Sequence, residues 1–225
     1  MNLPADTAAF DLIVFDWDGT LMDSTVHITR SIQRACADLG LPVPERSRAS
    51  HVIGLGLVDA MRHVCPGLPA ARYQDMVEAY RHHYLAGDAV IELFDGVAAA
   101  LAHYQQRGVL LAVATGKSRI GLDRAMQHTG LTDCFVATRT VDECHSKPHP
   151  QMLDDLTQVL GVDKRRTLMV GDTTHDLQMA LNAGTWAAGV SYGAHPVDAL
   201  HALSPLGCFD SFGALDAWLS PRLSA

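Results

Sequence analysis

The sequence predicts an α/β fold, with a parallel sheet as its core and an all-helical segment inserted near the N-terminus. Short apolar runs rich in Val, Ile and Leu alternate with longer helical patterns, which is typical of βαβ units around a parallel sheet. Several helical patterns end at a glycine, a usual stop signal at the C-terminus of a helix. Between residues 22 and 87 the alternation is interrupted, because no convincing strand pattern occurs there.

Six short runs are predicted as strands. The runs LIVF, VLLAVA, TLMV and WAAGV are continuously apolar, which is typical of parallel strands buried on both faces. In chain order the predicted strands are 12–15, 109–114, 135–137, 167–170, 186–190 and 208–209, the last being a weak edge strand.

Helical patterns lie between these strands and fill the inserted segment. The predicted core helices are 96–106, 120–128, 151–160, 176–182 and 212–219. Those of the inserted segment are 25–39, about 57–64 and 70–85, with prolines between them. We therefore expect an α/β core formed by residues 1–21 and 88–225, and a helical module formed by residues 22–87.

Composition limits the function classes. The 225 residues are 48% hydrophobic and 19% charged, which suits a folded domain with an insertion. A formal net charge of −8 without a block of Lys or Arg disfavours nucleic acid or a membrane surface as partner. No apolar run reaches the roughly 20 residues of a membrane span, and the N-terminus lacks a signal-peptide pattern. With five scattered cysteines and no CxxC, we expect reduced thiols and a cytoplasmic protein.

Polar residues follow four of the predicted strands at the point where each strand ends. In open α/β sheets, ligands bind outside the carboxyl ends of the strands, so we expect these residues to form one site. They are Asp16, Asp18, Thr115, Gly116, Lys147, Asp172 and Asp176.

The residue types at this edge indicate phosphoryl transfer. Four carboxylates close together cannot all stay ionised without cations, and a single lysine offsets one of them. A magnesium ion, which prefers carboxylate and water oxygens, would supply the remaining positive charge. The Thr115 hydroxyl and the Gly116 amide are candidate donors to an anionic substrate. A free carboxylate can serve as the nucleophile and form an aspartyl-phosphate.

The segment DWDGTLMDS resembles the DxDGT signature of the haloacid dehalogenase superfamily, and the three other segments match its remaining motifs in order. The resemblance is closest to the phosphoglycolate phosphatase-like subgroup and spans residues 11 to about 219. It implies a Rossmann-like core and identifies the inserted segment as a helical cap domain. The cap would close over the substrate and open to release product.

The resemblance also implies a role for each motif residue. Asp16 would attack phosphorus, and Asp18 would first protonate the leaving alcohol and then activate water. Thr115 and the Gly116 amide would bind phosphoryl oxygens. Lys147 would pair with the nucleophile and with the transferring phosphate.

The same resemblance implies a magnesium site. Its ligands would be Asp16, Asp172 and the backbone carbonyl of Asp18. Asp176 would bind the ion directly or through water, and the sequence leaves these two alternatives open.

Alternative activities differ in the residues they need. The dehalogenase branch lacks a second aspartate in the first motif, so Asp18 favours hydrolysis of phosphate esters. A sugar phosphomutase or a pyrophosphatase remains possible on the same core. A non-catalytic binding module is disfavoured because every motif residue is present. We expect a small phosphorylated metabolite, phosphoglycolate-like, as substrate, and the oligomeric state is open.

Two further features have open roles. Lys117 is either a surface lysine at a helix start or a residue that assists with phosphate. The segment 54–56, GLG, is either a turn between helices or a loop that faces the active site.

Overall fold

The computed structural model describes residues 10–87 and 90–224, and a parallel sheet of six strands forms the core of this part of the chain. The strands are β1 (Leu12–Phe15), β2 (Leu110–Ala114), β3 (Ala137–Arg139), β4 (Thr167–Gly171), β5 (Trp186–Val190) and β6 (Cys208–Phe209). Their order in the sheet is β3-β2-β1-β4-β5-β6. The direction in which strands are added therefore reverses between β1 and β4, which is where open α/β sheets bind ligands.

All six strands are predicted by the sequence, and β3 differs most in its bounds. The apolar run at 135–137 suggests a strand that begins at Phe135, whereas the strand begins at Ala137. β3 is an edge strand with half-buried side chains, and it is held by backbone pairing with β2. Apolar side chains are therefore a poor guide to its position.

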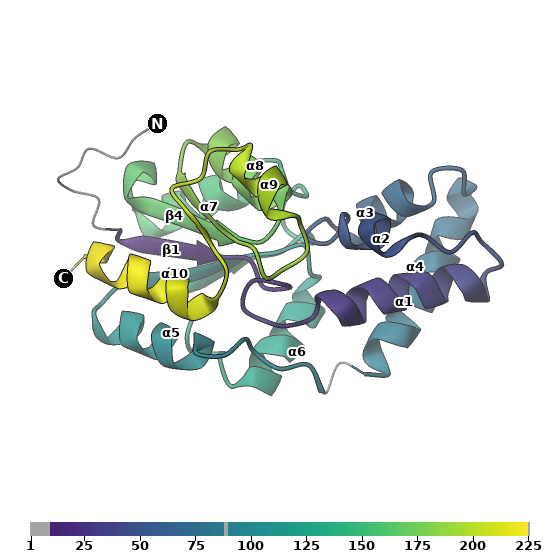
Figure 1. Cartoon of the computed structure of the whole chain (residues 1–225), viewed down its shortest axis with the longest axis horizontal. Helices are drawn as coiled ribbons and strands as arrows, with labels where there is room; N and C mark the ends of the chain where they lie inside the picture. The colour runs from purple at the N-terminus through teal and green to yellow at the C-terminus, as the bar shows by residue number, and fades with distance from the viewer. Residues whose placement is uncertain (1–9, 88–89, 225) are drawn as a thin grey trace.

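Helices cover both faces of the sheet (Figure 1). One face carries α5 (Val97–Gln106), α6 (Arg119–Thr129) and α10 (Phe212–Leu219), and the other carries α7 (Gln151–Leu160), α8 (Thr174–Ala183) and α9 (Val197–His201). Short 3₁₀ turns span Lys164–Arg166 and Ser220–Arg222. Successive β1 side chains point to opposite faces, so Ile13 and Phe15 join one apolar cluster and Leu12 and Val14 the other.

The helix predictions are largely confirmed. Glycines 130, 161 and 184 end α6, α7 and α8, as the sequence predicts. α9 is not predicted, because five residues are too few to show a helical period. Within the described residues, no helix combines the length and apolar composition that a bilayer span requires.

The inserted segment forms a group of helices with its own apolar cluster. Its helices are α1 (Thr25–Asp38), α2 (Arg46–Ser50), α3 (Leu57–Val64) and α4 (Tyr73–Leu85), with a 3₁₀ turn at Ala70–Arg72. Ile32, Met61 and Met76 are buried in this cluster. Figure 1 shows the group beyond the end of β1. α2 is not predicted, and the predicted boundary at residue 88 lies outside the described residues.

The chain leaves the core and returns to it through two adjacent segments. Met22 forms an isolated antiparallel bridge with Leu93. The amide of Asp23 donates to the carbonyl of Glu92 at 2.9 Å. The two connections between the core and the inserted helices therefore lie side by side.

Candidate active site

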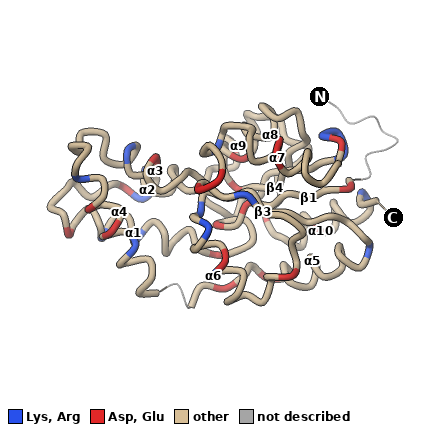
Figure 2. Tube along the Cα trace, turned by 180° about the vertical axis from the view of Figure 1, so that it is seen from behind, with Lys and Arg blue, Asp and Glu red and all other residues tan. Residues whose placement is uncertain are grey.

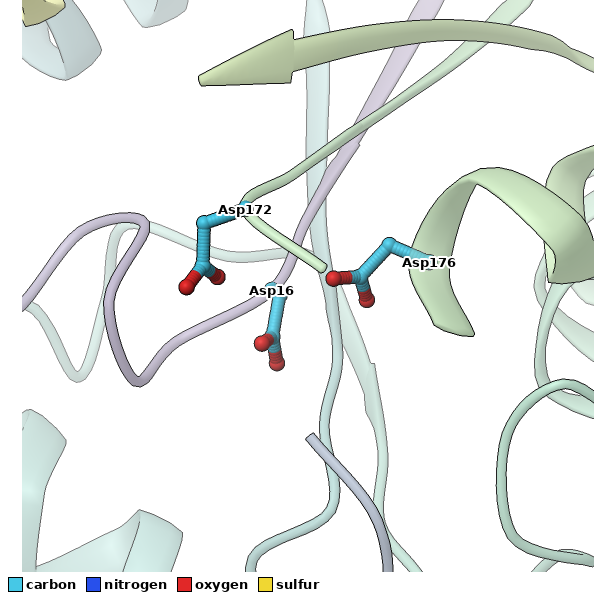
Figure 3. Close-up of side chains that lie close together, drawn as sticks. All are labelled: Asp16, Asp172 and Asp176. Atoms are coloured by element: carbon cyan, nitrogen blue, oxygen red, sulfur yellow. The ribbon is translucent and has the colours of Figure 1, made fainter. Parts of the chain in front are cut away.

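Three aspartates from β1, β4 and α8 meet at the carboxyl edge of the sheet (Figure 3). Asp16 follows β1 directly, Asp172 follows β4, and Asp176 lies in the first turn of α8. All three side chains are fully buried. Each offers a carboxylate oxygen, and these oxygens all lie within 4.8 Å of one another. The sequence predicts that these three residues come together at this edge of the sheet, and they do.

Lys147 is the cation of this group. Its Nζ lies 2.8 Å from Oδ1 of Asp16 and 2.6 Å from Oδ1 of Asp176, and its side chain is fully buried. Oδ2 of Asp176 accepts hydrogen bonds from the hydroxyl and the amide of Thr173, at 2.7 and 3.1 Å, so both oxygens of Asp176 are engaged. Thr173 and Asp176 form the capping box that begins α8. The capping box that begins α8 thus also fixes the position of the Asp176 carboxylate.

Asp172 is held by neighbours that leave little room around it. Its Oδ1 accepts from the hydroxyl of Thr20 at 2.8 Å, and its Oδ2 accepts from the amide of Ala194 at 2.7 Å. Gly19 has a φ of 81°, and a Cβ at Gly19 or Gly193 would collide with this carboxylate. The glycine after the paired aspartates therefore permits both the turn and the close approach of Asp172.

The electrostatics of the group call for an additional cation. Burial raises the pKa of Asp16 to about 7, although the charge of Lys147 opposes the shift. Burial, with the charges of Asp16 and Asp176, also raises the pKa of Asp172 well above its usual range. Neither oxygen of Asp16 accepts a hydrogen bond from the described residues, and the Lys147 contact is a close ion pair. A buried carboxylate without hydrogen bonds, beside two others, fits a hard divalent ion such as Mg²⁺.

Asp18 has a separate set of partners. The hydroxyl of Ser24 donates to its Oδ1 at 2.7 Å, and Nζ of Lys117 donates to Oδ1 and Oδ2 at 3.0 and 2.9 Å. Nζ of Lys117 also donates to the hydroxyl of Tyr84, on α4, at 2.9 Å. The side chain of Lys117 is only 9% exposed, so the surface-lysine alternative is wrong. Burial opposes its charge, but Asp18 and Tyr84 raise its pKa above the usual value.

Thr115 and Gly116 follow β2 beside this group. Thr115 is almost fully buried, and its hydroxyl accepts from the amide of Lys117 at 3.2 Å. A Cβ at Gly116 would lie 2.5 Å from the carbonyl oxygens of Gly54 and Leu55. The loop that contains Gly54 therefore packs directly on the predicted phosphate-binding segment, and the alternative in which it faces the site is correct.

A cavity of about 810 Å³ opens between the core and the inserted helices. Asp16, Asp18, Thr115 and Gly116 lie in its wall. Figure 2 shows acidic and basic residues side by side at this junction. The structure thus brings Asp16, Lys147, Asp172 and Asp176 into contact, and places Asp18, Thr115 and Gly116 around the adjoining cavity.

Sequence reasoning missed several residues that support the site. Tyr84 contacts Lys117, and Thr20 and Ser24 each hold an aspartate. His195 is almost fully buried, and its ring stacks on that of His51 with centroids 4.6 Å apart. The DGT-x-x-x-S spacing after Asp18 is the one local signal that could have identified Thr20 and Ser24.

The fold and this group define a hydrolase of the haloacid dehalogenase type. The model of the haloacid dehalogenase-like hydrolase family matches residues 13–190. The chain therefore belongs to this family, and the expected family and Rossmann-like α/β core are confirmed.

Similar proteins agree with this assignment. Over 207 residues the chain is 35% identical to the probable phosphatase IndB of Dickeya dadantii, covering 89% of this chain and 90% of that protein. It is 35% identical over 187 residues to the tyrosine-protein kinase PtkA of Mycobacterium tuberculosis, covering 81% of this chain but 63% of that longer protein. A predicted phosphoglycolate phosphatase from Haemophilus somnus superimposes with a TM-score of 0.81 at 25% identity, covering 92% and 96% of the two chains. The expectation of an enzyme of the phosphatase type agrees with the first and third of these.

Proposed function

We propose that this chain is a magnesium-dependent phosphatase that hydrolyses an organic phosphomonoester through an aspartyl-phosphate intermediate. One observation carries the proposal. The buried carboxylate of Asp16 accepts no hydrogen bond from the described residues and lies 2.8 Å from Lys147, at the wall of a cavity that also contains Asp18. A nucleophile needs a free oxygen, and Asp16 offers one.

In the proposed mechanism Asp16 forms the bond to phosphorus as the alcohol leaves. Lys147 favours the ionised form of Asp16 and neutralises charge on the transferring phosphoryl group. The Thr115 hydroxyl and the Gly116 amide bind phosphoryl oxygens at the end of β2. These residues orient the ester for attack, which supplies much of the acceleration in phosphoryl transfer.

Asp18 moves the proton in both half-reactions. It gives a proton to the leaving alcohol, then removes one from the water that attacks the aspartyl-phosphate. Lys117 and Ser24 fix its carboxylate against the cavity wall. Because Asp18 has partners other than Lys147, the nucleophile and the acid–base group are held independently.

The magnesium ion would be held by Asp16, Asp172 and the backbone carbonyl of Asp18. When bound, it would supply the positive charge that the buried carboxylates lack. Both oxygens of Asp176 are engaged by Lys147 and Thr173. This engagement supports contact between Asp176 and the ion through water.

Residues 22–87 act in this proposal as a cap domain. Their own apolar cluster and the adjacent connections near Met22 and Leu93 support movement as a unit. In the closed arrangement the loop at Gly54 packs on Gly116 and excludes bulk water.

The test is phosphate release from a panel of phosphorylated metabolites, phosphoglycolate included, with Mg²⁺ and with EDTA. We expect release with Mg²⁺ and none with EDTA, and none from the Asp16→Asn variant. Isomerisation of a sugar phosphate without release would indicate a mutase instead. Release from pyrophosphate but from no ester would indicate a pyrophosphatase.

A further inference from the structure

The cavity beside the candidate active site is much larger than a two-carbon phosphate requires. Its volume of about 810 Å³ is in the range of pockets that enclose drug-sized molecules. It extends from Asp16 and Asp18 between α3, α4 and α6. The leaving group of the ester would occupy this space, because Asp16 and Asp18 both lie in its wall.

Most of the wall contributed by the inserted helices is apolar. Val52, Ile53, Leu57, Met61 and Val77 all line the cavity. Burying apolar surface of a ligand against such a wall is favourable, whereas burying hydroxyl or carboxylate groups there without partners is costly. The wall is therefore suited to an apolar leaving group.

Exposed apolar side chains lie in the same lining. Val58 on α3, Leu85 on α4 and Ile120 on α6 are 46%, 48% and 74% exposed. Single exposed apolar residues need no explanation, but these three come from separate elements and face one cavity. A ligand with an apolar body would remove their surface from water.

Two aromatic rings continue the wall up to Asp18. Tyr80 and Tyr84 stack with centroids 5.8 Å apart, and the hydroxyl of Tyr84 contacts the ammonium that binds Asp18. Burial raises the pKa of Tyr80 well above its usual value, and the charge of Asp18 adds to the shift. The aromatic surface thus adjoins the polar group formed by Tyr84, Lys117 and Asp18.

The charged residues of the lining do not favour a second anionic group near the phosphate. Lys117 is held by Asp18. Arg81 and Arg124 have exposed side chains. A second anionic group close to Asp18, such as the carboxylate of phosphoglycolate, would have to compete with Asp18 for the ammonium of Lys117.

We infer that the substrate is a phosphate monoester of an uncharged, largely apolar alcohol that is longer than the two-carbon skeleton of phosphoglycolate. The inference rests on the proposed function and names its substrate class.

Ethyl, butyl and hexyl phosphate, compared with phosphoglycolate, test it directly. The three alkyl esters have leaving groups of nearly equal basicity, so differences in kcat/KM between them report burial of the chain. We expect kcat/KM to rise roughly three- to fivefold with each added methylene group, and hexyl phosphate to exceed phosphoglycolate.

A matched pair of valine variants tests whether the dependence of kcat/KM on chain length arises in the cavity. Val58→Asn changes an exposed helix valine that lines the cavity, and Val159→Asn changes an exposed valine on α7 outside its lining. We expect Val58→Asn to lower the ratio of kcat/KM for hexyl over ethyl phosphate at least threefold. Val159→Asn should leave that ratio at the wild-type value.

The outcomes separate this inference from the function on which it rests. Magnesium-dependent release without dependence on chain length, or with phosphoglycolate preferred, would overturn the apolar substrate class and leave the phosphatase intact. An equal ratio of kcat/KM for hexyl over ethyl phosphate in Val58→Asn and wild type would also overturn the apolar substrate class. No release from any ester would overturn the proposed function itself.

Discussion

The ammonium of Lys117 binds both carboxylate oxygens of Asp18, at 3.0 and 2.9 Å, although the two residues lie 99 positions apart. The same ammonium donates to the hydroxyl of Tyr84 at 2.9 Å. One side chain of the core therefore connects the proposed acid–base group to the inserted helices. This one contact therefore joins Asp18 of the core to α4 of the inserted segment.

Loss of the ion pair between Lys117 and Asp18 should destabilise the protein, because both side chains are largely buried. We expect Lys117→Met to lower the free energy of unfolding by about 3 kcal/mol, because the buried carboxylate of Asp18 would lose its ion-pair partner. Turnover of an alkyl phosphate should fall at least tenfold. Lys164→Met is the control, since it breaks an exposed ion pair with Asp154 and should cost under about 1 kcal/mol. The measurement is urea unfolding. Similar decreases in the free energy of unfolding for the two variants would contradict the prediction.

Asp16→Asn should abolish turnover and leave the fold intact. We expect activity to fall more than about a thousandfold, since an amide cannot replace the carboxylate as nucleophile. Without metal, its melting temperature should equal or exceed that of wild type, because one of three crowded buried charges is removed. Asp75→Asn, at an exposed carboxylate outside the lining of the cavity, is the control for activity. A folded, active Asp16→Asn would exclude Asp16 as the nucleophile.

Asp18→Asn should affect substrates according to their leaving group. An alkoxide leaves poorly and needs a proton, whereas p-nitrophenolate leaves without one. We expect kcat to fall about a hundredfold or more with alkyl phosphates, and clearly less with p-nitrophenyl phosphate, where only activation of water is impaired. The measurement is kcat for both esters in wild type and variant. Equal losses on both would argue against Asp18 as the leaving-group acid.

The meeting of Asp16, Lys147, Asp172 and Asp176 was predictable because it follows from topology. Asp16 and Asp172 directly follow β1 and β4, whereas Lys147 lies in the loop after β3 and Asp176 in the helix after β4. Parallel strands end at the same edge of the sheet, so the segments that follow them meet there. The apolar runs that identify β1 and β4 therefore also locate the site.

The contacts of Lys117 and His195 were not predictable in this way. Lys117 meets Tyr84 because α4 packs over the site, and His195 is buried because the loop at His51 covers it. Both contacts join the core to the inserted helices. Such packing depends on the shapes of two distant surfaces, which leave no local period or motif in the sequence.

Magnesium that binds the aspartate group should stabilise the folded protein, and the stabilisation should grow with the ratio of Mg²⁺ concentration to its dissociation constant. At a Mg²⁺ concentration one hundred times its dissociation constant, the free energy of unfolding rises by about 2.7 kcal/mol. We expect Mg²⁺ to raise the melting temperature of wild type and to leave that of Asp172→Asn almost unchanged. Sodium chloride at equal ionic strength is the control for screening. Equal shifts in both proteins would place the ion elsewhere.

The stability of the metal-free protein should also depend on pH through His195. Burial, with the charges of His175 and His51, lowers the pKa of His195 to about 4. Its Nδ1 accepts from the amide of Thr174 at 3.0 Å, and so the neutral ring carries its proton on Nε2, which donates to the carbonyl of His51. Protonation at Nδ1 would break the first of these bonds.

The sign of this dependence follows from the two pKa values of His195. The unfolded chain, with a pKa near 6.5, binds more protons than the folded one between about pH 4 and 6.5. The contribution of His195 to the free energy of unfolding is therefore retained above pH 6.5 and is lost with falling pH below it, by about 2 kcal/mol at pH 5. The raised pKa values of Asp16 and Asp172 act in the opposite direction, so the His195 contribution is read from the difference between wild type and a His195 variant. Urea unfolding at pH 7.5 and 5.0 measures the difference. The His195→Gln variant should lack the destabilisation at pH 5 that comes from His195. The His128→Gln variant, changed at an exposed position, should keep the pH dependence of wild type. Identical pH dependence in all three proteins would show that His195 titrates normally.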